Sequence, residues 1–155
     1  MSAMSLLKLI HLHQVWPVIA AAAMLTGCKP LPQEQARTEP PEVVLPASVL
    51  ELPPVEAVAL MQSTPDLVIL DVRTEAEIKK EGRIAGAQNY DYLHGEAMFE
   101  RLEKLDRAKF FLIYCAIGGR SKLAAVRMTG MGFTNLAVIK GGLNAWVVAR
   151  MPLTD

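Results

Sequence analysis

The sequence predicts one α/β domain in which helices cover both faces of a parallel sheet of about five strands. From about residue 49 onward, short runs rich in β-branched residues alternate with stretches of helical periodicity, which is typical of strand-helix-strand units. Two runs, residues 67–70 (LVIL) and 110–114 (FFLIY), are continuously apolar, as expected for central strands that are buried on both faces. The length of 155 residues suits a single hydrophobic core.

We expect the strands near residues 49–52, 67–71, 87–89, 110–115 and 136–139. We expect the helices near residues 55–62, 75–80, 96–105, 121–131 and 143–149. In the fourth of these helices, apolar and small residues recur three and four positions apart, which is the spacing of one helix face. Before the fifth helix, Gly141-Gly142 permits a tight turn, and Trp146 is expected in the core.

Charge and cysteine content exclude some classes of protein. The formal net charge is zero, the first 27 residues contain one lysine and no acidic residue, and all sixteen acidic residues lie beyond position 33. This asymmetry is typical of a targeting segment and not of a nucleic-acid-binding face. Two cysteines are too few for a disulfide framework, and their different surroundings indicate separate roles.

The N-terminal segment has the features of an export signal. Residues 15–25 form an apolar run of eleven residues, whereas a membrane-spanning helix needs about 20. The run leads into Leu25-Thr26-Gly27-Cys28, which resembles the lipobox of bacterial lipoproteins. This resemblance implies a signal peptide over residues 1–27 and lipidation of Cys28. The alternative is an ordinary signal peptide that is followed by a cysteine.

A lipidated Cys28 would hold the protein on a membrane without spanning it, because each buried methylene of an acyl chain contributes about 0.8 kcal/mol. Lys29 follows where an aspartate tends to retain lipoproteins at the inner membrane, so a periplasm-facing lipoprotein of the outer membrane is favoured. Residues 28–48 show no periodic pattern, and seven of the ten prolines lie between positions 29 and 54. We therefore predict a proline-rich tether over residues 28–48 and the folded domain over residues 49–155.

The most reactive side chain lies where a predicted strand ends. Asp71 and Cys115 each follow a continuous apolar run, so both are expected at the carboxyl edge of the sheet, where open α/β sheets bind ligands. Cys115 begins the segment Cys115-Ala116-Ile117-Gly118-Gly119-Arg120-Ser121. Its glycines let successive N–H groups face one point, and the next helix adds the positive end of its dipole. With the charge of Arg120, these groups favour a thiolate and would stabilise a persulfide.

Five short motifs occur in order along the domain: Leu70-Asp71-Val72-Arg73 with Glu77, Gly82-Arg83-Ile84-Ala85-Gly86-Ala87, Cys115-x-x-Gly118-x-Arg120-Ser121, Gly132-Phe133-Thr134-Asn135 and Gly141-Gly142-x-x-x-Trp146. The third resembles the active-site loop of rhodanese-like domains. The others resemble the family's Asp-Val-Arg motif, its Gly-His-Ile-x-Gly-Ala turn and its closing segment. The resemblance covers residues 49–151 and implies a single rhodanese-like domain.

The resemblance further implies a sulfurtransferase of the thiosulfate:acceptor class that needs no metal and no organic cofactor. Cys115 would take a sulfane sulfur from thiosulfate, a persulfide or a polysulfide, and residues 116–121 would bind the resulting persulfide. With Cys28 acylated, no second free thiol remains in the chain, so the acceptor must be external. A small thiol or an envelope protein thiol fits that role. We expect a monomer without a nucleic-acid partner.

Several other residues have expected supporting roles. Asp71 and Arg73 would hold the carboxyl edge of the sheet, and Arg73 and Glu77 have the spacing of a helix-face ion pair. Arg83 stands where the family usually has histidine, which argues against a proton-transfer role at that position. His94 is the only histidine beyond the predicted signal peptide, and we expect it at the surface.

Two other functions remain as alternatives. The loops of cysteine phosphatases and arsenate reductases hold an oxyanion in a similar nest of N–H groups, but they carry five residues between cysteine and arginine, and this chain has four. The second alternative is a tethered, non-catalytic module that binds a partner or senses thiol oxidation in the envelope. The complete Cys-x-x-Gly-x-Arg segment argues against it.

Overall fold

The computed structural model describes residues 43–155. The predicted signal peptide, the lipidation site Cys28 and most of the predicted tether lie outside the described residues. Within residues 43–155, no helix combines the length and the apolar character that crossing a membrane requires.

The strands of the described chain form one parallel sheet with the order β1-β5-β4-β2-β3. They are β1 (Val49–Leu52), β2 (Val68–Asp71), β3 (Gln88–Asn89), β4 (Phe111–Tyr114) and β5 (Leu136–Ile139). The central strand β4 is buried along its whole length, which explains its continuous apolar run. The predicted fold class, a single α/β domain with a five-stranded parallel sheet, is confirmed.

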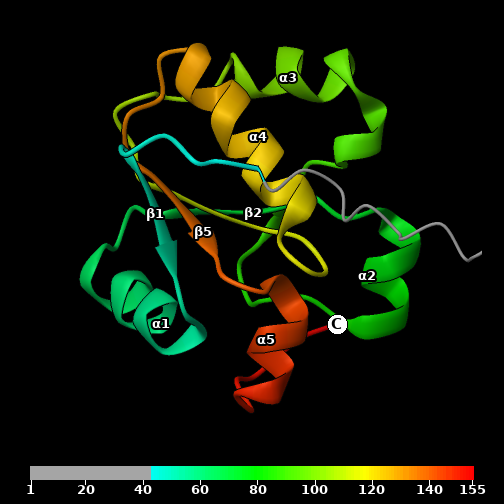
Figure 1. Ribbon diagram of the computed structural model, residues 1–155. Helices are drawn as coiled ribbons and strands as arrows, with labels where there is room; N and C mark the ends of the chain where they lie inside the picture. Colours follow the sequence, from blue (N-terminus) through cyan, green and yellow to red (C-terminus); the bar gives the residue numbers. More distant parts are fainter. Residues whose placement is uncertain (1–42) are drawn as a thin grey trace, which may run out of the picture. The chain divides into compact units, whose positions relative to one another are not determined.

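Helices cover both faces of this sheet. They are α1 (Pro54–Ser63), α2 (Glu75–Glu81), α3 (Glu96–Leu102), α4 (Gly119–Gly130) and α5 (Gly142–Val148), with a short 3-10 helix, η1 (Tyr92–His94), between β3 and α3. Figure 1 shows α3 and α4 on one side of the sheet and α1 and α5 on the other, with α2 near the C-terminus. Some of the helical connections between parallel strands therefore lie on one face of the sheet, and others lie on the opposite face.

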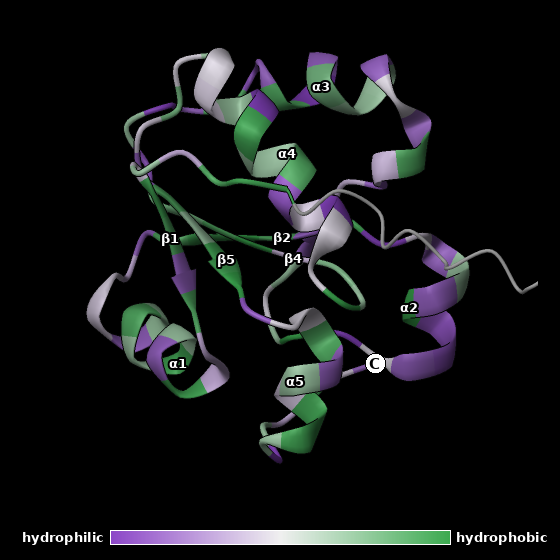
Figure 2. Cartoon of the chain, viewed as in Figure 1, coloured by the Kyte–Doolittle hydropathy of each residue, from purple (hydrophilic) through white to green (hydrophobic). Residues whose placement is uncertain are grey.

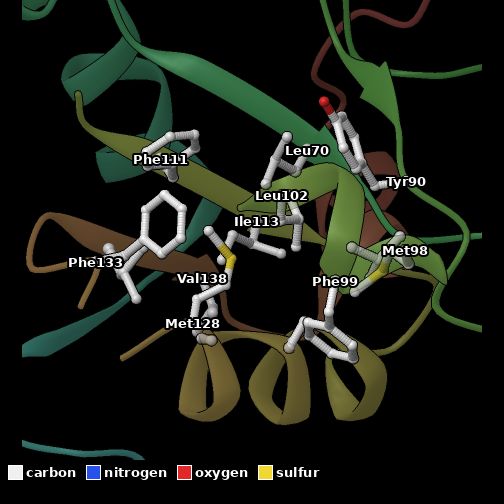
Figure 3. Packing of buried hydrophobic residues seen from close by; sticks show 14 of the residues in the cluster. Leu70, Tyr90, Met98, Phe99, Leu102, Phe111, Ile113, Met128, Phe133 and Val138 are labelled. Atoms are coloured by element: carbon white, nitrogen blue, oxygen red, sulfur yellow. The ribbon is translucent and has the colours of Figure 1, made fainter. Parts of the chain in front are cut away.

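Alternate residues of the strands supply two hydrophobic clusters, one on each face. Toward α3 and α4, Phe111 packs edge-to-face against Phe133, with the ring centroids 5.2 Å apart. Figure 3 shows Phe99 of α3 and Met128 of α4 in the same cluster. On the opposite face, Trp146 of α5 is buried against the sheet. In Figure 2 the strands are predominantly hydrophobic and α2 is predominantly hydrophilic, so α2 presents mostly polar residues.

Candidate active site

Cys115 directly follows β4 and lies at the carboxyl edge of the sheet. Its Sγ atom accepts a hydrogen bond from the backbone N–H of Gly118 at 3.1 Å. Gly118 has φ +104°, a left-handed conformation that folds the chain back over the sulfur and that side-chain-bearing residues rarely adopt. The first N–H groups of α4 follow immediately and have no partner one turn earlier in the helix. The sulfur thus lies where an N–H group and a helix N-terminus both favour negative charge.

The first turn of α4 closes the loop from one side. Ser121 is fully buried, and its hydroxyl donates to the carbonyl of Gly118 at 2.9 Å, while the N–H of Lys122 donates to the same carbonyl at 3.0 Å. Ser121 was predicted to bind the persulfide. In the structure its hydroxyl donates to the Gly118 carbonyl and so fixes the loop's backbone, while persulfide binding by Ser121 stays a prediction.

The N-terminus of α5 holds the loop from the other side. The N–H of Leu143 donates to the carbonyl of Cys115 at 2.8 Å, and the N–H of Asn144 donates to the carbonyl of Ala116 at 3.0 Å. A Cβ atom on Gly142 would lie 2.4 Å from the carbonyl oxygen of Cys115, so only glycine fits there. The sequence had indicated a turn at Gly141-Gly142 but gave no sign that this turn contacts the cysteine loop.

The tip of the loop is apolar and open to solvent. Ile117 is 70% exposed, Ala116 is half-buried, and Cys115 itself is 1% exposed. The sulfur atom itself is therefore almost inaccessible to solvent, while the tip of its loop is exposed. The nearby hollow of about 640 Å³ beside α2 is lined by residues such as Lys79, Arg83 and Asp155 and contains none of the loop's residues.

Arg120, the second residue of α4, makes a two-pronged ion pair with Glu77 of α2. Its Nη1 and Nη2 atoms donate to the two carboxylate oxygens at 2.8 and 2.5 Å. The hydrogen bonds from Arg120 lower the pKa of Glu77 to about 2, and those to Glu77 raise the pKa of Arg120. A smaller contribution to the raised pKa of Arg120 comes from Cys115. Both partners are charged at neutral pH.

The start of α2 fixes the position of Glu77. Thr74 caps the helix: the N–H of Glu77 donates to the Thr74 hydroxyl oxygen at 3.2 Å, and the Thr74 N–H donates back to the Glu77 carboxylate at 2.9 Å. This reciprocal arrangement is a capping box. The residue that pairs with Arg120 is therefore held by its own helix terminus.

Asp71 and Arg73 form a separate ion pair that is fully buried behind the site. The guanidinium donates to the carboxylate from Nε at 3.0 Å and from Nη2 at 2.7 Å, and Nη1 donates to Glu81 at 3.2 Å. The expected pairing of Arg73 with Glu77 was wrong. Arg73 precedes α2, so the four-residue spacing does not place the two side chains on one helix face.

Two further polar residues, Asn89 and Tyr114, lie against this buried pair, and no role was predicted for them from the sequence. Asn89 donates from Nδ2 to the carbonyls of Asp71 and Arg73 at 3.0 and 2.7 Å, which joins β3 to the end of β2. Tyr114, the residue before Cys115, has its pKa raised by burial and by the Asp71 charge, and its hydroxyl accepts a bond from the N–H of Ile84 at 3.1 Å. Nothing in their sequence spacing indicates these contacts.

His94 and Arg83, for which the sequence suggested possible roles, make no contact with the Cys115 sulfur. His94 is exposed, and its Nε2 atom lies 3.8 Å from the carboxylate of Asp91. Arg83 pairs through its backbone with Thr154 in an isolated antiparallel bridge. Among residues 43–155, no group of three or more His, Cys, Asp or Glu side chains is arranged to hold a metal ion.

A cysteine at the end of the central strand of a parallel sheet, with its Sγ atom bonded by the N–H of a glycine-rich turn, defines a class of cysteine-loop α/β proteins. Within that class, the chain matches the Rhodanese-like domain family over residues 54–149. The chain belongs to this family.

Named relatives support the assignment. The chain is 33% identical over 95 residues to the thiosulfate sulfurtransferase GlpE of Pseudomonas putida (strain GB-1), which covers 61% of this chain and 82% of that protein. Among solved structures, it is similar to the polysulfide-sulfur transferase homodimer of Wolinella succinogenes, with a TM-score of 0.59 and 26% identity over 70% of this chain and 80% of the other.

A second similar structure carries a different description. A Rhodopseudomonas palustris CGA009 protein of unknown function, described as a possible tyrosine phosphatase, is 33% identical with a TM-score of 0.60, covering 69% of this chain and 86% of that chain. The comparisons therefore support sulfurtransferase activity as a property of the family.

Proposed function

We propose that this protein is a rhodanese-type sulfurtransferase that moves a sulfane sulfur from a donor to a thiol acceptor through a persulfide on Cys115. The observation that carries the proposal is the hydrogen bond of 3.1 Å from the Gly118 N–H to the Cys115 Sγ atom at the N-terminus of α4. This arrangement stabilises an anionic sulfur, and both the thiolate and the persulfide of the proposed cycle are anionic.

In the first half-reaction, the Cys115 thiolate attacks the outer sulfur of the donor. With thiosulfate, a new S–S bond forms to Cys115 while the donor's S–S bond breaks, and sulfite leaves with the electron pair. The terminal persulfide sulfur then occupies the loop. The Gly118 N–H, which already donates to the Cys115 Sγ atom, and the free N–H groups of the first turn of α4 would bond to it.

In the second half-reaction, an external thiolate attacks the outer sulfur of the persulfide. The sulfur passes to the acceptor, and the electron pair of the broken bond returns to Cys115, so the cycle involves no net oxidation. Cys115 is the only free cysteine in the described part of the chain. An acceptor thiol from a small molecule or a protein therefore completes the cycle.

Mass spectrometry of the full chain tests this function. After incubation with thiosulfate or a polysulfide and removal of excess donor, we expect the intact mass to increase by one sulfur atom. The increase should be lost in the Cys115→Ser variant and reversed by added thiol. A protein that stays at its original mass with every sulfane donor would contradict the proposal.

A phosphoester substrate tests the phosphatase alternative in the same experiment. The structurally similar R. palustris protein is described as a possible tyrosine phosphatase. In this chain, however, both terminal nitrogens of Arg120 are bonded to Glu77, which leaves them poorly placed to hold a tetrahedral oxyanion. We expect no Cys115-dependent release of phosphate.

We further propose that the protein acts in the cell envelope as a lipoprotein that is anchored through Cys28. Support for this comes from the apolar run at residues 15–25 and the lipobox-like Leu25-Thr26-Gly27-Cys28. In a bacterial host, the wild-type protein should fractionate with membranes, and Cys28→Ala should accumulate as an uncleaved, unlipidated form. Unchanged processing and fractionation of Cys28→Ala would contradict lipidation at this residue.

A further inference from the structure

Arg120 lies in the first turn of α4, two residues after Gly118, whose N–H donates to the Cys115 sulfur, and its charge is compensated by Glu77. Both terminal nitrogens of the guanidinium contact the two carboxylate oxygens, at 2.8 and 2.5 Å, and the two side chains are 24% and 30% exposed. An ion pair with this geometry presents almost no net charge to a molecule that approaches the loop. The Cys115 loop therefore lacks the uncompensated cation that its sequence alone indicates.

The other cations at this edge of the sheet do not supply the positive charge that Glu77 compensates on Arg120. Arg73 is fully buried and paired with Asp71 and Glu81, and Lys122 pairs with Glu51 at 2.7 Å. Lys140 follows β5 and is exposed, where water and salt screen its charge. Arg101 is also exposed and donates to the carbonyl of Asn89 at the end of β3, two strands away from β4. Ala116 and Ile117 add no charge at the loop's tip. Attraction of an anionic donor then depends mainly on backbone N–H groups.

We propose that Glu77 is a positioning residue that sets donor specificity: by pairing with Arg120, it makes the Cys115 loop favour singly charged sulfane donors over doubly charged thiosulfate. The inference rests on the proposed sulfurtransferase function and adds the charge class of the donor. Organic persulfide and thiosulfonate anions belong to the favoured class.

Two donors that differ by one charge provide the test. Thiosulfate carries two negative charges and leaves as sulfite, whereas methanethiosulfonate carries one and leaves as methanesulfinate, and each delivers one sulfane sulfur to Cys115. The ratio of the two kcat/KM values, measured with one thiol acceptor on the full chain, cancels any change in the reactivity of the thiolate. A smaller fraction of folded protein lowers both kcat/KM values equally, so it also leaves the ratio unchanged.

The decisive variant is Glu77→Gln. Glutamine can retain the capping-box contact with Thr74 but carries no charge, so Arg120 becomes an uncompensated cation. One unit of charge about 6 Å from the donor, at an effective dielectric constant of about 40, changes binding about tenfold per donor charge. We expect the ratio of thiosulfate to methanethiosulfonate kcat/KM to rise about tenfold, mainly through a lower KM for thiosulfate. The rise should disappear at about 1 M salt.

Two control variants separate specificity from structure. Glu77→Asp keeps the negative charge, so its ratio should stay near that of the wild type even if its total activity falls. Glu96→Gln removes an equal charge from the exposed Glu96–Arg127 ion pair between α3 and α4, and its ratio should also remain unchanged. An equal rise in Glu96→Gln would show that net charge, and not the Arg120 pair, sets the ratio.

The wild-type protein gives an independent result if Glu77→Gln does not fold. Because the paired site presents little net charge, raising the salt to about 1 M should lower its kcat/KM for thiosulfate by less than about threefold. A steep decrease with salt, or an unchanged ratio in folded Glu77→Gln, overturns the role of Glu77. If the wild type accepts sulfur from neither donor, the proposed sulfurtransferase function itself fails.

Discussion

Glu77 uses one carboxylate to join two elements of the site. Its Oε2 atom accepts bonds from the N–H and the hydroxyl of Thr74, each at 2.9 Å, which caps α2, and the same carboxylate pairs with Arg120 at the start of α4. These contacts are made to the ionised form. They hold the pKa of Glu77 at about 2, below its ordinary value of 4.5, with the bond from Arg120 as the main cause.

The free energy of unfolding should consequently depend on pH through this residue. Because the folded pKa is the lower one, the stabilisation is fully present above pH 4.5 and is lost as pH falls toward 2. The pKa difference sets an upper limit of about 3 kcal/mol on this stabilisation. The actual contribution is smaller, because water reaches part of the ion pair and screens it. Glu77→Gln should therefore be less stable than the wild type at pH 7, and this difference should shrink as pH falls from 5 to about 2.

Urea unfolding at pH 7 and at about pH 3 measures this difference. Other carboxylates titrate equally in both proteins, so only the difference between them reports on Glu77. A difference that stays constant across this range would mean that Glu77 stabilises the fold by packing and not by its charge.

At the residue level, the sequence could predict which side chains lie at the sheet's carboxyl edge but not how they pair. Asp71 and Cys115 follow recognisable apolar strands, so their location is a consequence of the fold. The partners of Arg73 and Arg120 depend on where α2 begins relative to the strand end. The start of α2 was predicted correctly, and Thr74-x-x-Glu77 has the spacing of a capping box, but the packing that brings Glu77 to Arg120 is not encoded by local spacing.

At the element scale, the N-terminus of α5 is a structural support for the cysteine loop. Its first free N–H groups, from Leu143 and Asn144, bond to the carbonyls of Cys115 and Ala116. Because these two carbonyls are held against α5, the Cys115–Ala116 and Ala116–Ile117 peptide groups have a fixed orientation. Gly142 makes the approach possible, because it lacks a Cβ and has φ +60°.

Gly142→Ala should lower sulfur transfer by about tenfold or more, since a shift of about 1 Å in a reacting group can cost a hundredfold in rate. Its Cβ would lie 2.4 Å from the Cys115 oxygen and 2.7 Å from the Ala116 oxygen, so the loop must move. The kcat/KM of the folded protein, normalised to the amount of reactive thiol, measures the effect.

Gly86→Ala is the matched control for backbone strain. Gly86 has φ +77°, and no atom lies within 4 Å of the place that a Cβ would occupy, so alanine there costs about 1 to 2 kcal/mol of stability without touching the loop. Its transfer rate per folded molecule should equal that of the wild type. Equal losses of activity in both variants would show that strain, and not contact with the loop, explains the effect of Gly142→Ala.

Most elements could be predicted from the sequence because their signals are strong. Strands β1 and β5 occupy the expected residues, and the apolar runs of β2 and β4 were recognised to within one residue at each end. The helix α4 begins at Gly119, two residues before the expected start, because glycines have low helix propensity and conceal a helix terminus. The helix η1 was missed because three residues are too few for a periodic pattern.

At the scale of the whole domain, the site is assembled from segments that are far apart in the sequence. The loop after β4 contains the sulfur, α2 supplies Glu77, and α5 supplies the N–H groups behind the loop. The parallel pairing brings the carboxyl ends of the strands to one edge, and the order β1-β5-β4-β2-β3 places β4 between β5 and β2. The site therefore depends on the complete sheet, and a fragment that lacks α5 should not retain the loop's geometry.

The whole chain also determines how the persulfide is discharged. It contains two cysteines, of which Cys115 is the only one in the described residues, so a lipidated Cys28 leaves no internal thiol to release the outer sulfur. For the purified lipidated protein we expect the added sulfur to remain until a thiol is supplied, and its loss to be first order in that thiol. Intact mass measured over time with and without thiol checks this. Loss of the sulfur without added thiol by the purified wild type, but not by Cys28→Ala, would contradict it, because Cys28 would then be acting as a free resolving thiol.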